Sequence, residues 1–277
     1  MKPFDGIPFD NHAIAMKLCD RVSVGIHAER DGVFQHHTMG FLLALSSSNF
    51  LITCRHTIMN VLNTNVELWI GPDDKHKAHR LLETFHFPEN PLNDVAITLL
   101  PDNVARSFGP DRFACFEDLH NSKLPSGTPC VLSGNLRDLS HRWDFSVLSS
   151  DSKLKAATYF GQTAKSPVCE GRLDEKLHFV IGANAAKTKH GNQDEWKSGV
   201  LNASYEGLSG TPVFAVDGNP FRPGWNPVDT KIIGVQSSFM EFESVAGNDK
   251  LLKVSRIESV RDVLSIVFPE IWRNRGG

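Results

Sequence analysis

The amino-acid sequence predicts an all-β fold in two halves with one α-helix at the C-terminus, and three observations lead to this prediction. Short apolar or alternating stretches bounded by turn residues recur along the chain, which is typical of β-strands. Residues 108–130 are rich in turn formers and have no sustained period, so they divide these stretches into two sets. A long helical period occurs only near the C-terminus. Two sets of short strands indicate two β-sheets.

Each half contains five predicted strands. In the first half they cover residues 21–28, 40–47, 50–54, 66–71 and 95–100. In the second half they cover residues 129–134, 144–149, 177–182, 211–216 and 231–238. Two loops, 184–199 and 217–230, are longer than a tight connection needs, and long loops in compact domains are often functional. We place one domain over residues 1–120 and a second over residues 121–277.

The C-terminal helix is expected over residues 255–268. Ser255 and Glu258 have the spacing of a capping box, in which two side chains satisfy N–H groups of the first turn. Apolar residues recur every three or four positions and line one face: Ile257, Val260, Val263, Leu264 and Val267. One other helical segment is expected, a short turn that follows His56.

Composition and charge narrow the class of protein. The chain has 277 residues, of which 40% are hydrophobic and 22% are charged, as in ordinary globular proteins. Its formal net charge of −3, without a run of Lys or Arg, argues against nucleic acid as a partner. No stretch approaches the roughly 18 apolar residues of a membrane span, and Pro, Gly and Asp interrupt the region where a signal peptide needs apolar residues. We expect no membrane partner.

The cysteines indicate a reducing compartment. There are five of them, they are scattered, and they form no CxxC pair. An odd number without a framework predicts buried free thiols, no disulfide, and a cytoplasmic location. The histidines, including His36 and His37, show no metal-ligand spacing, so we predict no metal site and no cofactor.

One stretch, "SYEGLSGTPVF" over residues 204–214, places a serine between glycines. Glycine adopts backbone angles that other residues avoid, so Gly207 and Gly210 would let Ser209 sit on a tight bend. Taken by itself, the stretch also fits an ordinary turn that leads into a strand. A serine hydroxyl is a weak nucleophile and requires a general base, usually a histidine held by a carboxylate. The stretch therefore raises the question of where such a pair would come from.

Two further stretches supply that pair. His56 ends the apolar strand in "LITCRH" and precedes a helical turn, so its side chain can lean into a cleft. Asp94 stands at the entrance of the buried strand in "NDVAITLL", where an unpaired carboxylate would be costly.

Together, "LITCRH", "NDVAITLL" and "GLSGTPVF" resemble the three motifs of the trypsin/chymotrypsin-like serine peptidases, in the same order and at intervals usual for that family. The resemblance covers roughly residues 20 to 265. It implies two six-stranded antiparallel β-barrels of the chymotrypsin type with a C-terminal α-helix and an active site between them. It also implies that Ser209 is the nucleophile, His56 the general base and Asp94 its orienting partner, with an oxyanion hole from the amides of Gly207 and Ser209.

The chain departs from the family in two places. Leu208 stands where zymogens have the Asp that pairs with a freed N-terminus, and no I-V-G-G-like stretch follows a basic site. A preformed oxyanion loop, a long loop or a regulatory protein partner would have to replace that switch. By a gapless count Ala203 floors the specificity pocket, so a preference for Arg or Lys is not implied. In "GVQSSF", Ser237 and Ser238 would bind the substrate backbone and Phe239 would narrow the pocket.

Two functions remain open. One is a serine endopeptidase that cuts a protein or peptide substrate through an acyl-enzyme. The other is a catalytically silent binding or scaffold protein of the same fold. Cys54 as a thiol nucleophile is disfavoured because it lies on a buried strand. As a trypsin-like peptidase without a secretion signal, the chain resembles the peptidases of bacterial regulatory and antiviral-defence systems. This resemblance implies that the protein is a regulated cytoplasmic protease.

Overall fold

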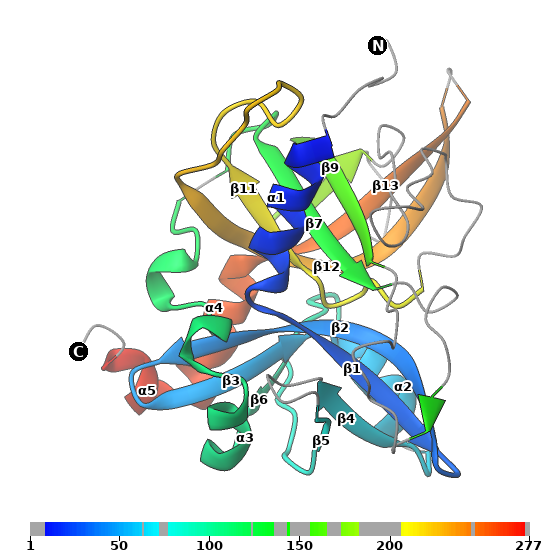
Figure 1. Cartoon of the computed structure of the whole chain (residues 1–277), viewed down its shortest axis with the longest axis vertical. Coiled ribbons are helices and arrows are strands. Elements are labelled where there is room, and N and C mark those ends of the chain that lie inside the picture. Colours follow the sequence, from blue (N-terminus) through cyan, green and yellow to red (C-terminus); the bar gives the residue numbers. More distant parts are fainter. Residues whose placement is uncertain are drawn as a thin grey trace.

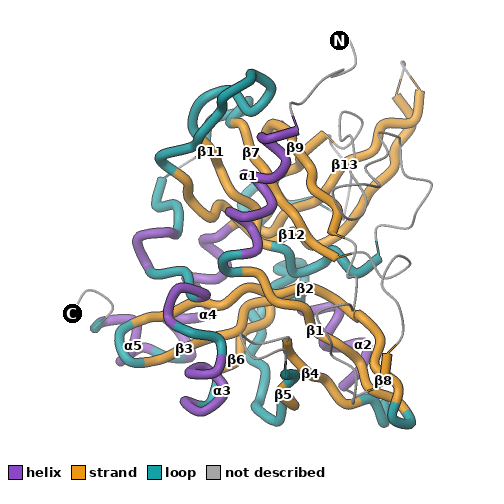
Figure 2. The backbone as a smooth tube through the Cα atoms, in the orientation of Figure 1, coloured by secondary structure: helices purple, strands orange, loops and turns teal. Residues whose placement is uncertain are grey.

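The chain forms two antiparallel β-sheets, with helix α4 (Ile257–Val267) at their junction (Figure 1). The computed structural model describes residues 9–62, 64–71, 77–122, 124–135, 143–144, 156–164, 173–182, 206–244 and 247–274. Strands are the main element of both halves, as Figure 2 shows. The two-sheet, all-β prediction is therefore confirmed.

The N-terminal sheet is a curled half-barrel with strand order β5-β4-β1-β2-β3-β6 (Figure 1). Its strands are β1 (Ser23–Arg30), β2 (Val33–Leu45), β3 (Ser48–Thr53), β4 (Glu67–Gly71), β5 (His79–Arg80) and β6 (Ala96–Leu99). A short strand from the second half of the chain, β8 (Trp143–Asp144), pairs with the start of β2. All these pairings are antiparallel.

The C-terminal sheet closes into a barrel with strand order β10-β13-β12-β11-β7-β9. Its strands are β7 (Pro129–Asn135), β9 (Ala156–Ala164), β10 (His178–Gly182), β11 (Pro212–Val216), β12 (Thr230–Ser244) and β13 (Gly247–Arg256). The six strands per half and the C-terminal helix match the expected chymotrypsin-type double barrel. Only the C-terminal set forms a closed ring through the described pairings.

Three apolar clusters hold this arrangement together. One lies within the N-terminal sheet and includes Ile26, Leu42 and Leu51. Another lies within the barrel and includes Leu208 and Val213. The largest joins the two sheets, because strands of both halves and α4 contribute to it. The seam between the sheets is therefore a packed interface, and side chains at its rim are held from both sides.

The helices depart from the sequence prediction. Helix α2 (Arg55–Leu62) and α4 fall where helical segments were expected. Three more were not expected: α1 (Phe9–Asp20), α3 (Asp102–Ser107) and α5 (Pro269–Arg273). Helix α1 lies against the barrel at β7 and β9, where it buries Ala15 and Cys19 (Figure 1). None of the described helices is long and apolar enough to cross a membrane.

The predicted capping box of α4 is wrong. Ser255 is still part of β13, where it pairs with Val235 of β12 and His178 of β10. Its backbone is committed to the ladder, so the helix begins two residues later, after Arg256, without a side-chain cap. The predicted apolar face is confirmed, since Ile257, Val260, Val263 and Leu264 are buried.

The loop over residues 217–230 has a structural role in the described contacts. Trp225 is buried in the cluster between the sheets, and its Nε1 donates to the Asp217 carbonyl at 2.9 Å. Asn11 of α1 donates to the carbonyls of Pro220 and Arg222, both at 2.7 Å. The N-terminal helix and this loop therefore fix each other. The other long loop, 184–199, lies outside the described residues.

Candidate active site

His56 and Asp94 form a close pair at the seam. His56 is the second residue of α2, directly after β3, and Asp94 precedes β6. Asp94 Oδ2 lies 2.6 Å from His56 Nδ1, and Asp94 Oδ1 accepts the backbone N–H of His56 at 2.8 Å. A carboxylate only accepts, so Nδ1 carries a proton, and in the neutral ring Nε2 keeps its lone pair. The His56 side chain is 43% exposed, so a bound substrate can approach it.

Ser209 lies on a bend that requires glycine. Gly207 and Gly210 have φ values of 96° and 90°, in the left-handed region that side chains disfavour. A Cβ on Gly210 would lie 1.8 Å from the Met39 carbonyl oxygen, so no other residue fits there. The tight bend predicted from the "GLSGTP" stretch is therefore present, and at Gly210 it is sterically enforced.

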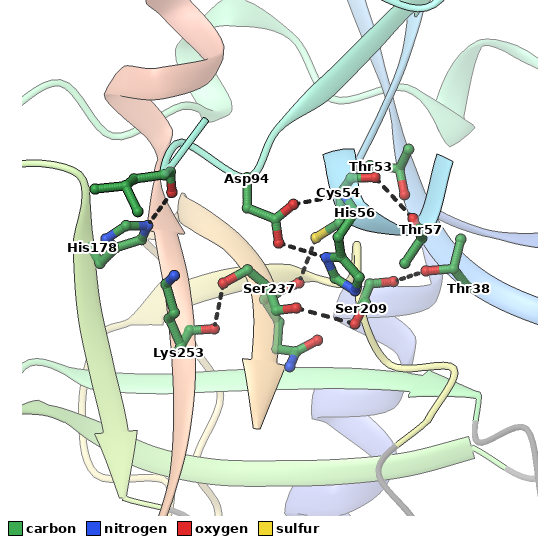
Figure 3. A network of polar contacts seen from close by, with 12 residues as sticks. Thr38, Thr53, Cys54, His56, Thr57, Asp94, His178, Ser209, Ser237 and Lys253 are labelled. Atoms are coloured by element: carbon green, nitrogen blue, oxygen red, sulfur yellow. Dashed lines mark hydrogen bonds and ion pairs between the residues drawn. The ribbon is translucent and has the colours of Figure 1, made fainter. Parts of the chain in front are cut away.

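The His56 ring lies between Asp94 and Ser209 in the close-up view (Figure 3). The Ser209 hydroxyl donates to the Ser237 carbonyl at 3.2 Å, and the described contacts include no hydrogen bond from it to His56. Contacts between a nucleophile and its base are often long without substrate and tighten in the complex. The fold thus brings the three predicted residues together, but the hydrogen bond from the Ser209 hydroxyl to His56 is not among the described contacts.

Strand β2 holds the backbone of the serine loop from the opposite sheet. The Ser209 carbonyl accepts the Met39 N–H at 2.8 Å and also the Thr38 hydroxyl. The Thr53 hydroxyl in turn donates to the Met39 carbonyl at 2.6 Å. On the other side, the Gly210 N–H donates to the Gln236 carbonyl at 2.8 Å. Each sheet therefore positions the loop through backbone atoms next to Ser209.

A buried histidine supports Gly207. His36 of β2 is fully buried, and its Nε2 lies 3.1 Å from the Gly207 carbonyl and 3.2 Å from the Asn135 carbonyl. Both partners only accept, so Nε2 carries the proton and the ring is neutral. Burial, with smaller contributions from nearby His27 and His37, lowers the pKa of His36 to about 3. Sequence patterns missed this residue because nothing in "FQHHTM" distinguishes a loop support from a packed core histidine.

The predicted oxyanion amides have no competing acceptor among the described residues. Within the described residues, neither the Gly207 N–H nor the Ser209 N–H donates a hydrogen bond. The His36 contact turns the Gly207 carbonyl toward β2. Two free N–H groups beside a hydroxyl can bind a carbonyl oxygen that gains negative charge.

The predicted substrate-binding residues fall into two groups. Ala203 lies outside the described residues. Ser237 is buried, and its carbonyl receives the Ser209 hydroxyl. Ser238 and Phe239 are half-buried and line a cavity of about 580 Å³ beside His56 and Asp94. Their binding roles stay predictions.

Cys54 is adjacent to this site but differs from its other members. It is fully buried, and its Sγ donates to the Gln236 carbonyl at 3.0 Å. Burial, and then the charge of Asp94, raises the pKa of this thiol well above its ordinary value. Candidate ligand atoms of Cys54, His56 and Asp94 lie within 4.8 Å of one another. A protonated thiol engaged as a donor is a poor nucleophile.

Comparisons with known proteins locate similar folds only. No protein-family model matches the sequence, and no curated protein matches it. Among solved structures, the chain is similar to the MamO protease domain from Magnetospirillum magneticum in its apo form. That match has 10% identity and a TM-score of 0.47, and it covers 88% of this chain and 96% of that one.

A second solved structure is described as showing that aromatic interactions drive the coupled folding and binding of the intrinsically disordered Sesbania mosaic virus VPg protein. It has 13% identity to this chain and a TM-score of 0.44, with 87% of each chain covered. At this level the two likenesses concern the backbone arrangement and carry no information on activity.

Proposed function

We propose that the protein is a serine endopeptidase that cleaves a protein substrate through Ser209, His56 and Asp94. The observation that carries this proposal is the 2.6 Å contact between Asp94 and Nδ1 of His56, which leaves Nε2 unprotonated on the side of Ser209. A carboxylate that holds a histidine in this tautomer is the arrangement that general-base activation of a hydroxyl requires.

The reaction follows from these positions. Ser209 Oγ attacks the scissile carbonyl carbon while its proton passes to His56 Nε2, and Asp94 stabilises the imidazolium that forms. The carbonyl oxygen becomes an oxyanion that accepts from the N–H groups of Gly207 and Ser209. The His56 proton then passes to the leaving amine, which gives an acyl-enzyme and the first product. A water, deprotonated by His56, hydrolyses the ester and restores Ser209.

We also propose that the protein works in a reducing compartment such as the cytoplasm. The four described cysteines are free thiols, and the buried Cys54 serves as a hydrogen-bond donor. Oxidation of a thiol packed in this way would disrupt the strand beside His56, so the site is suited to reducing conditions.

A catalytically silent binding protein is the second candidate, and one observation favours it. The Ser209 hydroxyl donates to the Ser237 carbonyl instead of to His56. If that bond persists when a peptide is bound, the hydroxyl stays unactivated and the groove only holds its partner.

Identification of new N-termini in a cell lysate separates these candidates. The lysate is incubated with the wild-type protein and, as the matched control, with Ser209→Ala. A peptidase generates a defined set of new N-termini that is absent with Ser209→Ala. Equal sets from both proteins, together with capture of intact partners, would instead establish the binding protein.

A further inference from the structure

The cavity beside His56 is lined by two positively charged side chains, those of Arg55 and Lys253. It is about 580 Å³ in volume and is lined by the first turns of α2, the turn before β6, and facing parts of β12 and β13. Lys253 on β13 and Arg55 on α2 contribute the positive charges. Asp94 is the acidic residue of the described lining, and both of its oxygens already accept hydrogen bonds from His56.

Lys253 has no carboxylate partner in the described chain. It is half-buried and pairs with Ser238 across the β12–β13 ladder, and no described ion pair includes its ammonium. In Figure 3 it lies between His178 and the site of Ser237 and Asp94. Burial lowers the pKa of Lys253, while the charge of Asp94 opposes that shift. A partly dehydrated ammonium gains free energy when a carboxylate reaches it.

Arg55 adds a second cation without an ion-pair partner among the described residues. Its Nη1 donates to the Pro88 carbonyl at 3.0 Å, and its guanidinium carbon lies 5.5 Å from the centre of the Phe87 ring. Both contacts fix the guanidinium without neutralising it. The cavity therefore keeps a positive field.

The remaining walls are mostly apolar, with Asn60 and Ser238 as the polar exceptions. Met59 and Leu92 are 41% and 42% exposed, and Phe239 lies between the cavity and the barrel core. Such walls suit a methylene stem, while the cations suit a carboxylate at its end. Glutamate combines these two features in one side chain.

The cavity also lies where a substrate would pass. It includes His56 and Ser238, and Ser238 directly follows the residue whose carbonyl receives the Ser209 hydroxyl. An extended peptide that pairs with β12 next to Ser209 would direct one side chain toward Lys253.

We propose that this cavity selects a substrate with an acidic side chain, preferably glutamate, among the four residues before the scissile bond, and that Lys253 is the residue that recognises it. The proposal rests on the proposed peptidase function. Aspartate is too short to cross the apolar walls as well as glutamate does, so it is the weaker ligand.

A peptide library with Glu, Gln or Lys at each of those four positions tests the proposal in two readouts. Hydrolysis is measured as kcat/KM with the wild-type protein, and binding is measured as fluorescence anisotropy with Ser209→Ala. At one position we expect Glu to exceed Gln about tenfold, which is about 1.4 kcal/mol. Lys253→Met abolishes that preference, Lys253→Arg keeps most of it, and Lys253→Glu transfers it to Lys.

A matched control is Lys231→Met. Lys231 is on β12 outside the cavity lining, where its ammonium lies 3.6 Å from Asp229 and 3.0 Å from the Glu117 carbonyl. This variant should keep the preference for Glu. Thermal unfolding of all variants shows whether a lost preference reflects lost folding, and the retained preference in Lys253→Arg excludes that explanation.

The outcomes distinguish the two proposals. The acidic subsite is overturned if peptides are hydrolysed without a preference for Glu at any position, or if the preference persists in Lys253→Met. In both cases the proposed peptidase function is retained. Lys253-dependent binding of Glu peptides by a protein that hydrolyses none of them overturns the peptidase and leaves the subsite standing. If the protein neither hydrolyses nor binds these peptides, both proposals are overturned.

Discussion

Two histidines of the N-terminal half of the chain, His56 on α2 and His36 on β2, show how the same side chain takes different roles in two regions of the site. His56 lies at the rim of the seam, 43% exposed, and contacts a carboxylate. His36 lies beneath the serine loop, fully buried, and its described hydrogen bonds go to two backbone carbonyls. A carboxylate stabilises an imidazolium, whereas burial keeps the His36 ring neutral even though its two carbonyl partners act in the opposite direction.

The difference assigns one ring to proton transfer and the other to support. His56 gains and loses a proton in the proposed cycle, so it must be reachable from Ser209 and from water. His36 must hold the Gly207 carbonyl in one orientation. Its low pKa keeps the ring neutral across the working pH range, with its single proton on Nε2, where it is donated to that carbonyl. The following predictions test that division, from the largest expected effect to the smallest.

Loss of His56 should have the largest effect. His56→Ala and Ser209→Ala each lower kcat by several orders of magnitude, and the double variant is scarcely slower than either, because the residues act as a unit. Steady-state kinetics on a cleaved peptide measure this. Multiplicative losses in the double variant would mean that the two residues act separately.

Loss of His36 should have a smaller effect, on the oxyanion loop. His36→Phe keeps an aromatic ring but removes the donor to the Gly207 carbonyl, so the backbone at Gly207 is no longer fixed and the N–H groups beside it lose their orientation. We expect kcat to fall about 10²-fold with little change in KM, as for a lost oxyanion donor.

His27→Phe is the matched control for that loss. His27 is buried on β1 and its ring packs edge-on against that of His36, but its Nε2 lies 3.0 Å from the Gly71 carbonyl and has no described hydrogen bond to the serine loop. It should lose stability and keep its kcat. Equal kcat losses in both variants would show that His36 acts only through general stability.

Acid should destabilise the protein through the buried histidines. The pKa values of His36 and His27 are lowered from 6.5 to about 3 and about 4, mainly by burial. Between about pH 6.5 and pH 4 the unfolded chain therefore binds protons that the folded chain does not, and the free energy of unfolding falls as the pH falls. Each site contributes up to about 1.4 kcal/mol per pH unit.

Urea unfolding at several pH values between 7 and about 4 measures this slope. His36→Phe should flatten it by about one proton, whereas His56→Ala should leave this contribution of the buried rings in place. An unchanged slope in His36→Phe would show that His36 is not the group that opposes protonation.

Removal of Cys54 should have the smallest effect on activity. The Cys54 thiol is buried and protonated beside an exposed base, so Cys54→Ala keeps kcat within a few-fold and loses about 1 kcal/mol of stability with its contact. Kinetics with and without a thiol-alkylating reagent check this. Loss of activity comparable to that of Ser209→Ala would make the thiol a participant.

Much of the fold was predictable from the sequence because strands follow a local pattern. Burial produces the short apolar or alternating runs that identified β1, β3, β4 and β6, and the helical period of α4 was correct even though its predicted cap was not. Helix α1 was not predicted from the sequence for two reasons. It begins at Phe9 and Asp10, directly after a stretch with Pro and Gly, and its buried face is defined by contacts with β7 and β9. Tertiary contacts of that kind leave no local period.

The site was predictable in part for the same reason. His56, Asp94 and Ser209 stand at strand ends flanked by distinctive residues, so their motifs could be read. His36 and Lys253 could not, because each lies inside an ordinary strand. Their significance comes from pairing across the seam to Gly207 and from facing the cavity, which depend on the assembled fold.

Labelling with a fluorophosphonate, followed by mass spectrometry, tests the central claim most directly, because the reagent reacts only with a serine hydroxyl that a neighbouring base activates. We predict one label per chain, on Ser209, that is lost in His56→Ala and retained in Cys54→Ala. A protein that stays unlabelled throughout, or a label on Ser209 that persists in His56→Ala, would contradict activation of Ser209 by His56.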